Sequence, residues 1–131
     1  MKLLLDTHTL IWYADGSPQL SSDAQALIVD PTNERFLSMA SVWEMAIKSG
    51  IGKITLSPNY REYLHRAVSS LQITILDITL EDCMKYEALP FPTEMHRDPY
   101  DRMIVVHALR HSFSLVSIDD KLDGYNVTRL W

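Results

Sequence analysis

The sequence is poor in cysteine, in long apolar runs and in net positive charge. Cys83 is the only cysteine among 131 residues, which excludes a disulfide within the chain and fits a reducing compartment. No stretch approaches the roughly 18 consecutive apolar residues of a membrane-spanning helix. The apolar opening of the chain ends at Asp6, before the core of a signal peptide is complete. We therefore expect a soluble, cytoplasmic protein with no membrane partner.

Acidic side chains outnumber basic ones. The 17 Asp and Glu residues against 12 Lys and Arg residues give a formal net charge of −5. This balance argues against partners that are held by bulk electrostatic attraction, such as duplex DNA, and a nucleic-acid role would need local positive charge. The composition, with 47% hydrophobic residues, is enough to bury one core. No linker or internal repeat divides the chain, so we predict a single domain over residues 1–131.

Several common signatures of enzymes and metal sites are missing. There is no Gly-x-Gly-x-x-Gly, no Walker A run and no Gly-x-Ser-x-Gly, which disfavours nucleotide-binding and serine-hydrolase functions. The segment at residues 3–6 (LLLD), followed by Thr9, faintly resembles the motif of the aspartate-nucleophile phosphatases. Their second aspartate would fall at His8, which argues against that function. The histidines lack metal-ligand spacing such as His-Glu-x-x-His and are interpreted as surface or packing residues: His8, His65, His96, His107 and His111.

Short apolar segments alternate with segments of helical periodicity. The apolar segments predict five strands, at residues 3–5, 35–38, 73–76, 114–117 and 127–130. Helical spacing predicts helices at residues 22–29, 42–49, 60–70, 80–88 and 100–110. This alternation predicts an α/β fold, a three-layer α/β/α sandwich with a central parallel sheet of about five strands. Ligands of such sheets bind outside the carboxyl ends of the strands.

Three acids have simple local explanations when each is taken alone. Asp6 directly follows the first predicted strand, where it suits the N-cap of a helix and a metal ligand equally well. Asp119 follows the fourth strand and suits a turn. Glu44 has capping-box spacing from Ser41 and stands four residues before Lys48. None of the three is diagnostic of function by itself.

The start of the last predicted helix resists a purely local explanation. Asp98 suits an N-cap, Pro99 the first helical position and Asp101 a favourable first-turn charge. Asp101 nevertheless shares a helical stripe with Ile104 and Val105, which should meet the sheet. A charge that serves only the helix end would not need to point inward.

Taken together, the four acids point to a shared site. Asp6, Glu44, Asp101 and Asp119 should all meet at one edge of the sheet, where their charges would repel one another unless a cation joined them. Hard oxygen ligands with room for water favour Mg²⁺ or Mn²⁺ over Zn²⁺. The sequence therefore predicts a divalent metal site.

The segments around these acids resemble the PIN-domain family, and specifically the VapC-type toxins of type II toxin–antitoxin systems. The resemblance runs from end to end, with its segments in order: residues 3–8 (LLLDTH), 38–48 (SMASVWEMAIK), 89–90 (LP), 96–104 (HRDPYDRMI), 115–119 (LVSID) and 130–131 (LW). It implies a PIN-like fold and a Mg²⁺- or Mn²⁺-dependent endoribonuclease that cleaves single-stranded or looped RNA as a toxin. It also implies a small VapB-like antitoxin partner and a homodimer.

The resemblance also implies residue roles. It makes Asp6, Glu44, Asp101 and Asp119 the catalytic metal ligands, with Asp98 near the site, either as a ligand or as the residue that orients the helix start. Thr7 and Ser117 match small hydroxyl positions beside the acids. The basic side chains nearest to RNA phosphates would be Lys48, Lys53, Arg97 and Arg102, with ordinary solvated surface charge as the alternative for Lys53 and Arg97.

Two questions stay open at the level of sequence. The alternative function is a non-catalytic PIN-like module that binds RNA or protein, which retention of all four acids argues against. The second question is whether an antitoxin or a second copy of the chain covers the apolar side chains that would not all fit inside so small a domain. These side chains are Trp12, Tyr13, Ile47 and Ile51.

Overall fold

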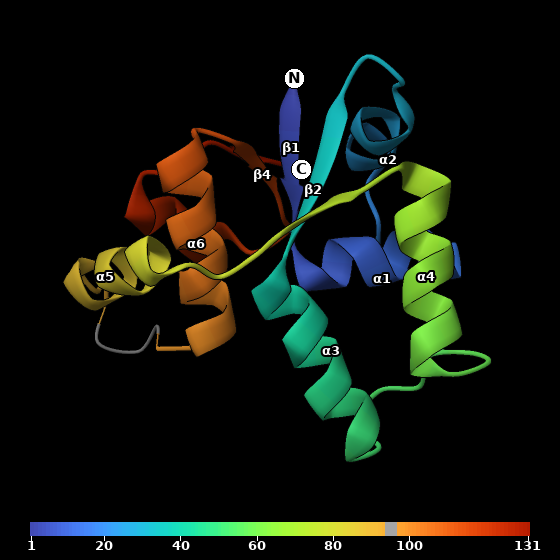
Figure 1. Ribbon diagram of the computed structural model, residues 1–131. Coiled ribbons are helices and arrows are strands. Elements are labelled where there is room, and N and C mark those ends of the chain that lie inside the picture. Colours follow the sequence, from blue (N-terminus) through green and yellow to red (C-terminus); the bar gives the residue numbers. More distant parts are fainter. Residues whose placement is uncertain (94–96) are drawn as a thin grey trace.

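The computed structural model describes residues 1–93 and 97–131, and its centre is a parallel five-stranded sheet (Figure 1). The strand order is β3-β2-β1-β4-β5. The strands are β1 Lys2–Leu5, β2 Glu34–Ser38, β3 Thr74–Leu76, β4 Ser114–Val116 and β5 Arg129–Leu130. All five predicted strands are confirmed, although β5 is shorter than predicted. His96, one of the predicted surface or packing histidines, lies outside the described residues.

Helices connect the strands and cover the sheet. They are α1 Thr7–Asp15, α2 Ser22–Val29, α3 Met39–Gly50, α4 Tyr60–Leu71, α5 Leu80–Ala88 and α6 Pro99–His111, with a 3-10 helix η1 at Asp120–Tyr125. Helix α3 begins three residues before the prediction because Ser38 caps it, its Oγ accepting a hydrogen bond from the amide of Ala40 at 3.0 Å. The capping box predicted for Ser41 and Glu44 is therefore wrong. Across the described part of the chain, no helix is long and apolar enough to cross a membrane.

The two faces of the sheet carry separate cores. Successive side chains of a strand point to opposite faces, so Leu3 and Leu5 pack with residues of α1, α2 and α4, whereas Leu4 packs with residues of α6 and η1. These three leucines are fully buried. Helices α5 and α6 lie to one side in Figure 1 and α1, α2 and α4 to the other. The predicted three-layer sandwich is confirmed.

Strand register brings the carboxyl ends of the central strands together. Leu5 at the end of β1 pairs with Leu37 of β2 on one side and with Val116 of β4 on the other. The amide of Asp6 continues this ladder with a 3.1 Å hydrogen bond to the carbonyl of Val116. Residues that directly follow β1 and β4 therefore lie side by side, and α3, which follows β2, starts at the same edge.

Candidate active site

Asp6 lies at the centre of this edge. Its Oδ1 accepts a 2.8 Å hydrogen bond from the amide of Thr7 as the N-cap of α1, and its Oδ2 accepts a 2.6 Å hydrogen bond from the hydroxyl of Ser117. The side chain is buried, with 8% of its surface exposed. Burial raises the pKa of Asp6, although the hydrogen bonds from Ser117 and Thr7 oppose that rise. Asp6 is thus both the helix cap and a buried acid.

The two predicted hydroxyl residues hold the site together. Ser117 is fully buried, and its Oγ also accepts a 3.1 Å hydrogen bond from the amide of Asp119. It therefore connects Asp6 to Asp119. Thr7 donates a 2.8 Å hydrogen bond to the Oγ of Ser41, one turn before Glu44 on α3. These contacts fix the strand ends relative to α3.

Glu44 is buried and paired with a lysine. Its Oε2 lies 2.5 Å from the Nζ of Lys48, one helical turn further along α3. Burial disfavours the charged form of Lys48, but the hydrogen bond and charge of Glu44, with the charges of Asp98 and Asp101, outweigh it and raise the pKa of Lys48. The predicted spacing of Glu44 and Lys48 is confirmed, and the ammonium group neutralises one acid of the site.

Asp101 faces inward from the first turn of α6, as the helical stripe predicted. Asp98 caps the helix, accepting hydrogen bonds from the amides of Tyr100 at 2.9 Å and Asp101 at 3.0 Å. The pKa of Asp101 rises to about 8, first because of burial and then because of four neighbouring charges. Those charges belong to Asp6, Asp98, Glu44 and Asp119. The structure thus brings all the predicted acids into one electrostatic field.

Asp119 also has the local role that its sequence position suggests. It caps η1, with its Oδ1 accepting a 3.1 Å hydrogen bond from the amide of Lys121. The side chain is only partly buried. Its charge still raises the pKa of Asp101. Asp119 is therefore both a turn residue and a member of the acidic cluster.

The donor chemistry of this cluster fits a hard divalent cation. Its potential ligands are carboxylate and hydroxyl oxygens, which favour Mg²⁺ or Mn²⁺. Within residues 1–93 and 97–131, no three His, Cys, Asp or Glu side chains are grouped closely enough to hold an ion as they stand. The charges of Asp6, Glu44 and Asp119 all act on Asp101, so these four acids are the group that a divalent cation would join.

Arg102 does not face RNA, contrary to the sequence interpretation. It is buried, with 2% of its surface exposed, and donates to the carbonyl of Leu89 at 2.7 Å. Its guanidinium stacks on the ring of Phe91 at 3.8 Å. Arg102 therefore holds the segment before α6. The basic side chains left for phosphate contacts are Lys48, Lys53 and Arg97, of which the last two are exposed.

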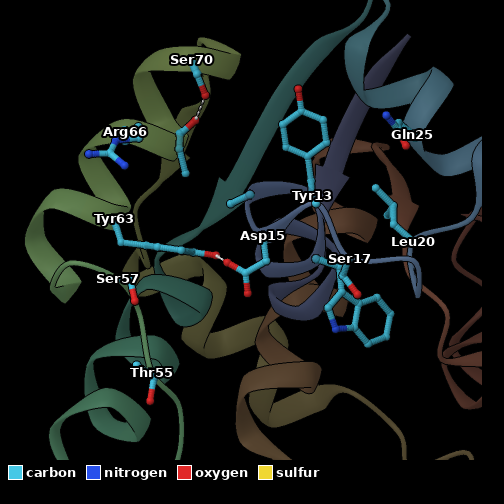
Figure 2. Close-up of a pocket in the computed structure, with 14 residues that line it drawn as sticks. Tyr13, Asp15, Ser17, Leu20, Gln25, Thr55, Ser57, Tyr63, Arg66 and Ser70 are labelled. Atoms are coloured by element: carbon cyan, nitrogen blue, oxygen red, sulfur yellow. Dashed lines mark hydrogen bonds between the residues drawn. The ribbon is translucent and has the colours of Figure 1, made fainter.

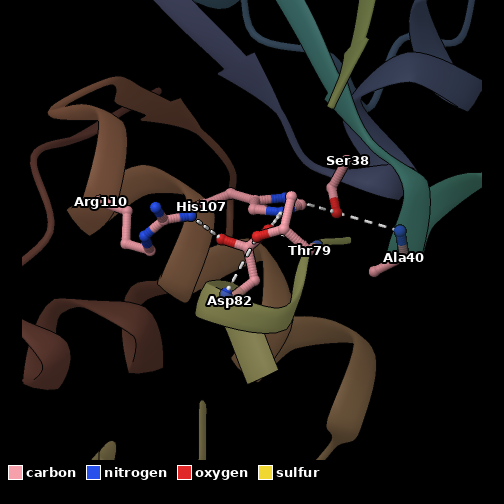
Figure 3. A network of polar contacts seen from close by, with 6 residues as sticks. All are labelled: Ser38, Ala40, Thr79, Asp82, His107 and Arg110. Atoms are coloured by element: carbon pink, nitrogen blue, oxygen red, sulfur yellow. Dashed lines mark hydrogen bonds and ion pairs between the residues drawn. The ribbon is translucent and has the colours of Figure 1, made fainter. Parts of the chain in front are cut away.

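The sequence did not reveal a buried polar network centred on His107 and Asp82 (Figure 3). His107 of α6 is fully buried, with its Nδ1 2.9 Å from the Oγ of Ser38 and its Nε2 3.1 Å from Oδ2 of Asp82. Arg110 pairs with the other oxygen of Asp82, and Oδ2 of Asp82 also accepts a 2.9 Å hydrogen bond from the amide of Thr79, the N-cap of α5. The network joins α5 and α6 to the start of α3. Only the Thr79–Asp82 capping spacing was visible in the sequence.

The chemistry of this network is structural. Burial lowers the pKa of His107 despite the charge of Asp82. A neutral ring can donate from Nε2 to Asp82 and accept at Nδ1 from Ser38, whose Oγ accepts in turn from the amide of Ala40. Ser, His and Asp stand in the order of a hydrolase triad, but all three are at most 1% exposed, so substrate cannot reach the hydroxyl. The interpretation of His107 as a packing residue is confirmed.

A cavity that none of the four clustered acids lines lies between α1, α2 and α4 (Figure 2). Its volume is about 760 Å³, and its walls include the half-buried Trp12 and Tyr13. Tyr63 of α4 donates a 2.9 Å hydrogen bond to Oδ1 of Asp15 across it. Of the other two side chains predicted at the surface, Ile47 is half-buried and Ile51 is 66% exposed. The prediction that apolar side chains of the early helices remain accessible is confirmed.

Fold and sequence together place the chain in a family. Residues 3–127 match the PIN domain family, and the chain belongs to that family, as its sequence resemblance indicated. It is 24% identical over 127 residues to Ribonuclease VapC22 of Mycobacterium tuberculosis, covering 97% of this chain and 94% of that protein.

Solved structures share the fold at low sequence identity. A structure of VapBC2 from Rickettsia felis bound to a DNA fragment from their promoter superposes with a TM-score of 0.74 at 17% identity, covering 99% of this chain and 98% of that one. A toxin–antitoxin complex from Klebsiella pneumoniae gives a TM-score of 0.67 at 19% identity, with coverage of 98% and 96%. FitAcB from Neisseria gonorrhoeae gives 0.66 at 20% identity, with the same coverage of both chains.

Proposed function

We propose that the chain is a Mg²⁺- or Mn²⁺-dependent endoribonuclease that acts as the toxin of a toxin–antitoxin pair. The observation that carries this proposal is the gathering of acids at one edge of the sheet, where Ser117 contacts both Asp6 and Asp119 and where the charges of Asp6, Glu44 and Asp119 act on the half-buried Asp101. Structural acids are normally placed beside cations, whereas a cluster of buried acids is the arrangement that a divalent ion stabilises. The name of the ribonuclease relative agrees with this chemistry.

Asp6, Glu44 and Asp101 have distinct parts in the proposed site. A divalent ion, when bound, would polarise the scissile phosphate and acidify a water for in-line attack. Asp6 is held rigid by Thr7 and Ser117, so it offers its carboxylate in one orientation. Glu44 must exchange the ammonium of Lys48 for the ion. Asp101 must release the proton that its raised pKa retains at neutral pH.

Single-stranded or looped RNA suits this protein better than duplex nucleic acid. With a net charge of −5, the chain lacks the bulk attraction that duplex binding relies on. Unstacked RNA offers bases and 2′-hydroxyls to local contacts. Lys48, once released from Glu44, and the exposed Lys53 and Arg97 would contact its phosphates.

A small VapB-like antitoxin is the proposed protein partner. Related folds occur in a structure named as a toxin–antitoxin complex and in one named VapBC2. The 760 Å³ cavity with Trp12 and Tyr13 in its walls is a surface that a partner segment could fill. A basic side chain of such a partner, placed at the acids, would compete with the metal. We also expect a homodimer and a cytoplasmic location, as the sequence suggested.

The decisive experiment is RNA cleavage by the purified chain without a partner. Structured and unstructured RNAs are incubated with Mg²⁺, Mn²⁺ or EDTA, and we expect cleavage with either metal and none with EDTA. Expression of the chain alone should slow bacterial growth, and the small reading frame beside its gene should relieve this effect. Harmless expression together with metal-independent RNA or protein binding would favour the non-catalytic PIN-like module instead.

A further inference from the structure

A small apolar groove lies between α3, α5 and α6, beside the acidic cluster but formed by different side chains. Its volume is about 190 Å³, well below the size of pockets that hold drug-sized ligands. It is therefore suited to one ring system rather than to a peptide helix. Its lining residues are Ala40, Trp43, Ile78, Cys83, Tyr86, Pro99, Tyr100 and Met103.

The two helices that supply inward acids, α3 and α6, also supply two of the aromatic side chains that line this groove. On α3, Trp43 precedes Glu44, and 56% of Trp43 is exposed whereas Glu44 is buried. On α6, Tyr100 precedes Asp101. The rings of Trp43 and Tyr100 meet edge to face, with centroids 5.5 Å apart and planes at 73°. Trp43 and Tyr100 of the groove therefore directly adjoin the acids Glu44 and Asp101 in the chain.

The chemistry of the walls selects a flat, uncharged group. None of the described residues that line the groove is charged or carries an amide side chain, so a phosphate or a sugar would find few partners there. The exposed indole of Trp43, beside this apolar groove, offers a flat face on which a ring can stack. Aromatic side chains in single-strand-binding proteins serve as stacking platforms for bases.

We propose that this groove binds one unstacked base of the RNA substrate, through stacking on Trp43 and contact with Tyr100. This inference rests on the proposed ribonuclease function and adds the recognition of the strand to it. Because the lining offers few hydrogen-bonding groups, recognition tolerates different sequences. It favours purines, whose larger rings cover more of the indole.

A second protein molecule is the competing occupant. Leu80 and Met84 of α5 are 74% and 55% exposed and do not line the groove. A protein interface that covered α5 would use these side chains as well as Trp43. A base in the groove would not touch them. Leu80→Ala is therefore a matched control for Trp43→Ala.

The test compares two oligoribonucleotides that differ only in their bases. Binding is measured in Ca²⁺ by fluorescence anisotropy for an ordinary single strand and for an abasic strand of equal length, and gels verify that the strands stay whole. We expect Trp43→Ala to weaken binding of the ordinary strand about 10-fold or more and to leave the abasic strand unchanged. Trp43→Phe should keep most of the binding, and Leu80→Ala all of it.

Alkylation of Cys83 gives an independent readout. Cys83 is the single cysteine of the chain, is exposed and lines the groove. The ordinary strand should slow its reaction with iodoacetamide in the wild-type protein but not in Trp43→Ala. The proposal is overturned if Trp43→Ala binds both strands as the wild type does. It is also overturned if protection follows protein concentration and is relieved by Leu80→Ala, which would mark a protein interface.

Cleavage by the wild type separates this inference from the function on which it rests. If the wild type cleaves RNA and Trp43→Ala has an unchanged KM, the groove inference alone fails. If the wild type cleaves no RNA under any metal condition but the Trp43-dependent preference for base-containing strands holds, the ribonuclease proposal alone fails. With both correct, Trp43→Ala raises KM about 10-fold or more and changes kcat much less.

Discussion

Ser117 donates a 2.6 Å hydrogen bond to Oδ2 of Asp6, across 111 positions of sequence and with both side chains buried. This bond stabilises the charged form of Asp6 against a burial that favours the neutral acid. The residue directly after β4 thus favours the charge on which metal binding would depend.

Ser117→Ala should impair cleavage without unfolding the protein. Hydrogen bonds to charged groups contribute about 1.5–3 kcal/mol, so we expect a loss of about 10-fold or more in kcat/KM at pH 7. The pKa of Asp6 should rise further, which moves the activity profile to higher pH. Ser70→Ala, which removes a part-buried hydroxyl on α4, is the control. An unchanged pH profile in Ser117→Ala would contradict this role.

Asp6→Asn and Asp101→Asn should each abolish metal-dependent cleavage while circular dichroism stays as in the wild type. Each variant removes one proposed ligand charge from the cluster. The control is Asp120→Asn, which changes an exposed acid next to Asp119 and should cleave normally. Near-normal cleavage by either cluster variant, with an ordinary Mg²⁺ dependence, would show that the acids are assigned wrongly.

The stability of the metal-free protein should depend on Asp101 and on pH. Its pKa in the folded state, about 8, lies above the ordinary value of 3.8, so between these values the folded state holds more protons than the unfolded state. Stability from this group is therefore complete below about pH 4 and is lost as pH rises towards 8. Asp101→Asn should melt close to the wild type at pH 4 and higher than the wild type at pH 8.

Mg²⁺ provides the internal check on this pH prediction. At pH 8 it should raise the Tm of the wild type, because an ion that binds only the folded state stabilises it. It should raise the Tm of Asp101→Asn much less. Melting curves of the two proteins that run parallel from pH 4 to pH 8 would mean that Asp101 ionises normally in the folded state.

Asp82→Ala should destabilise the fold by about 3–5 kcal/mol, the usual cost of removing one partner of a buried charged pair. The change leaves His107 without its Nε2 partner, Arg110 without its ion pair and α5 without its capping box. Urea unfolding measures the loss. Glu81→Ala, an exposed acid in the first turn of the same helix, should cost far less. Equal losses in the two variants would show that the network contributes little.

The sequence by itself determined the elements and the identity of the acids. Periodicity and turn residues are local, so the five strands and the main helices could be predicted to within a few residues. The end of a parallel strand is also a local feature, which placed Asp6 and Asp119 at one edge. The inward direction of Asp101 followed from its helical stripe, because a helix has a fixed period.

Only the tertiary structure decided which distant side chains meet. Ser38, Asp82 and His107 come from three different elements, and no local pattern predicts their contacts. The sequence predicted Arg102 as a cation available to RNA phosphates, yet Arg102 is buried and stacks on Phe91. Cys83 is exposed, because it lies on a face of α5 that the rest of the domain leaves uncovered. Helical and strand periods predict which face of an element is apolar, whereas long-range packing determines what covers that face.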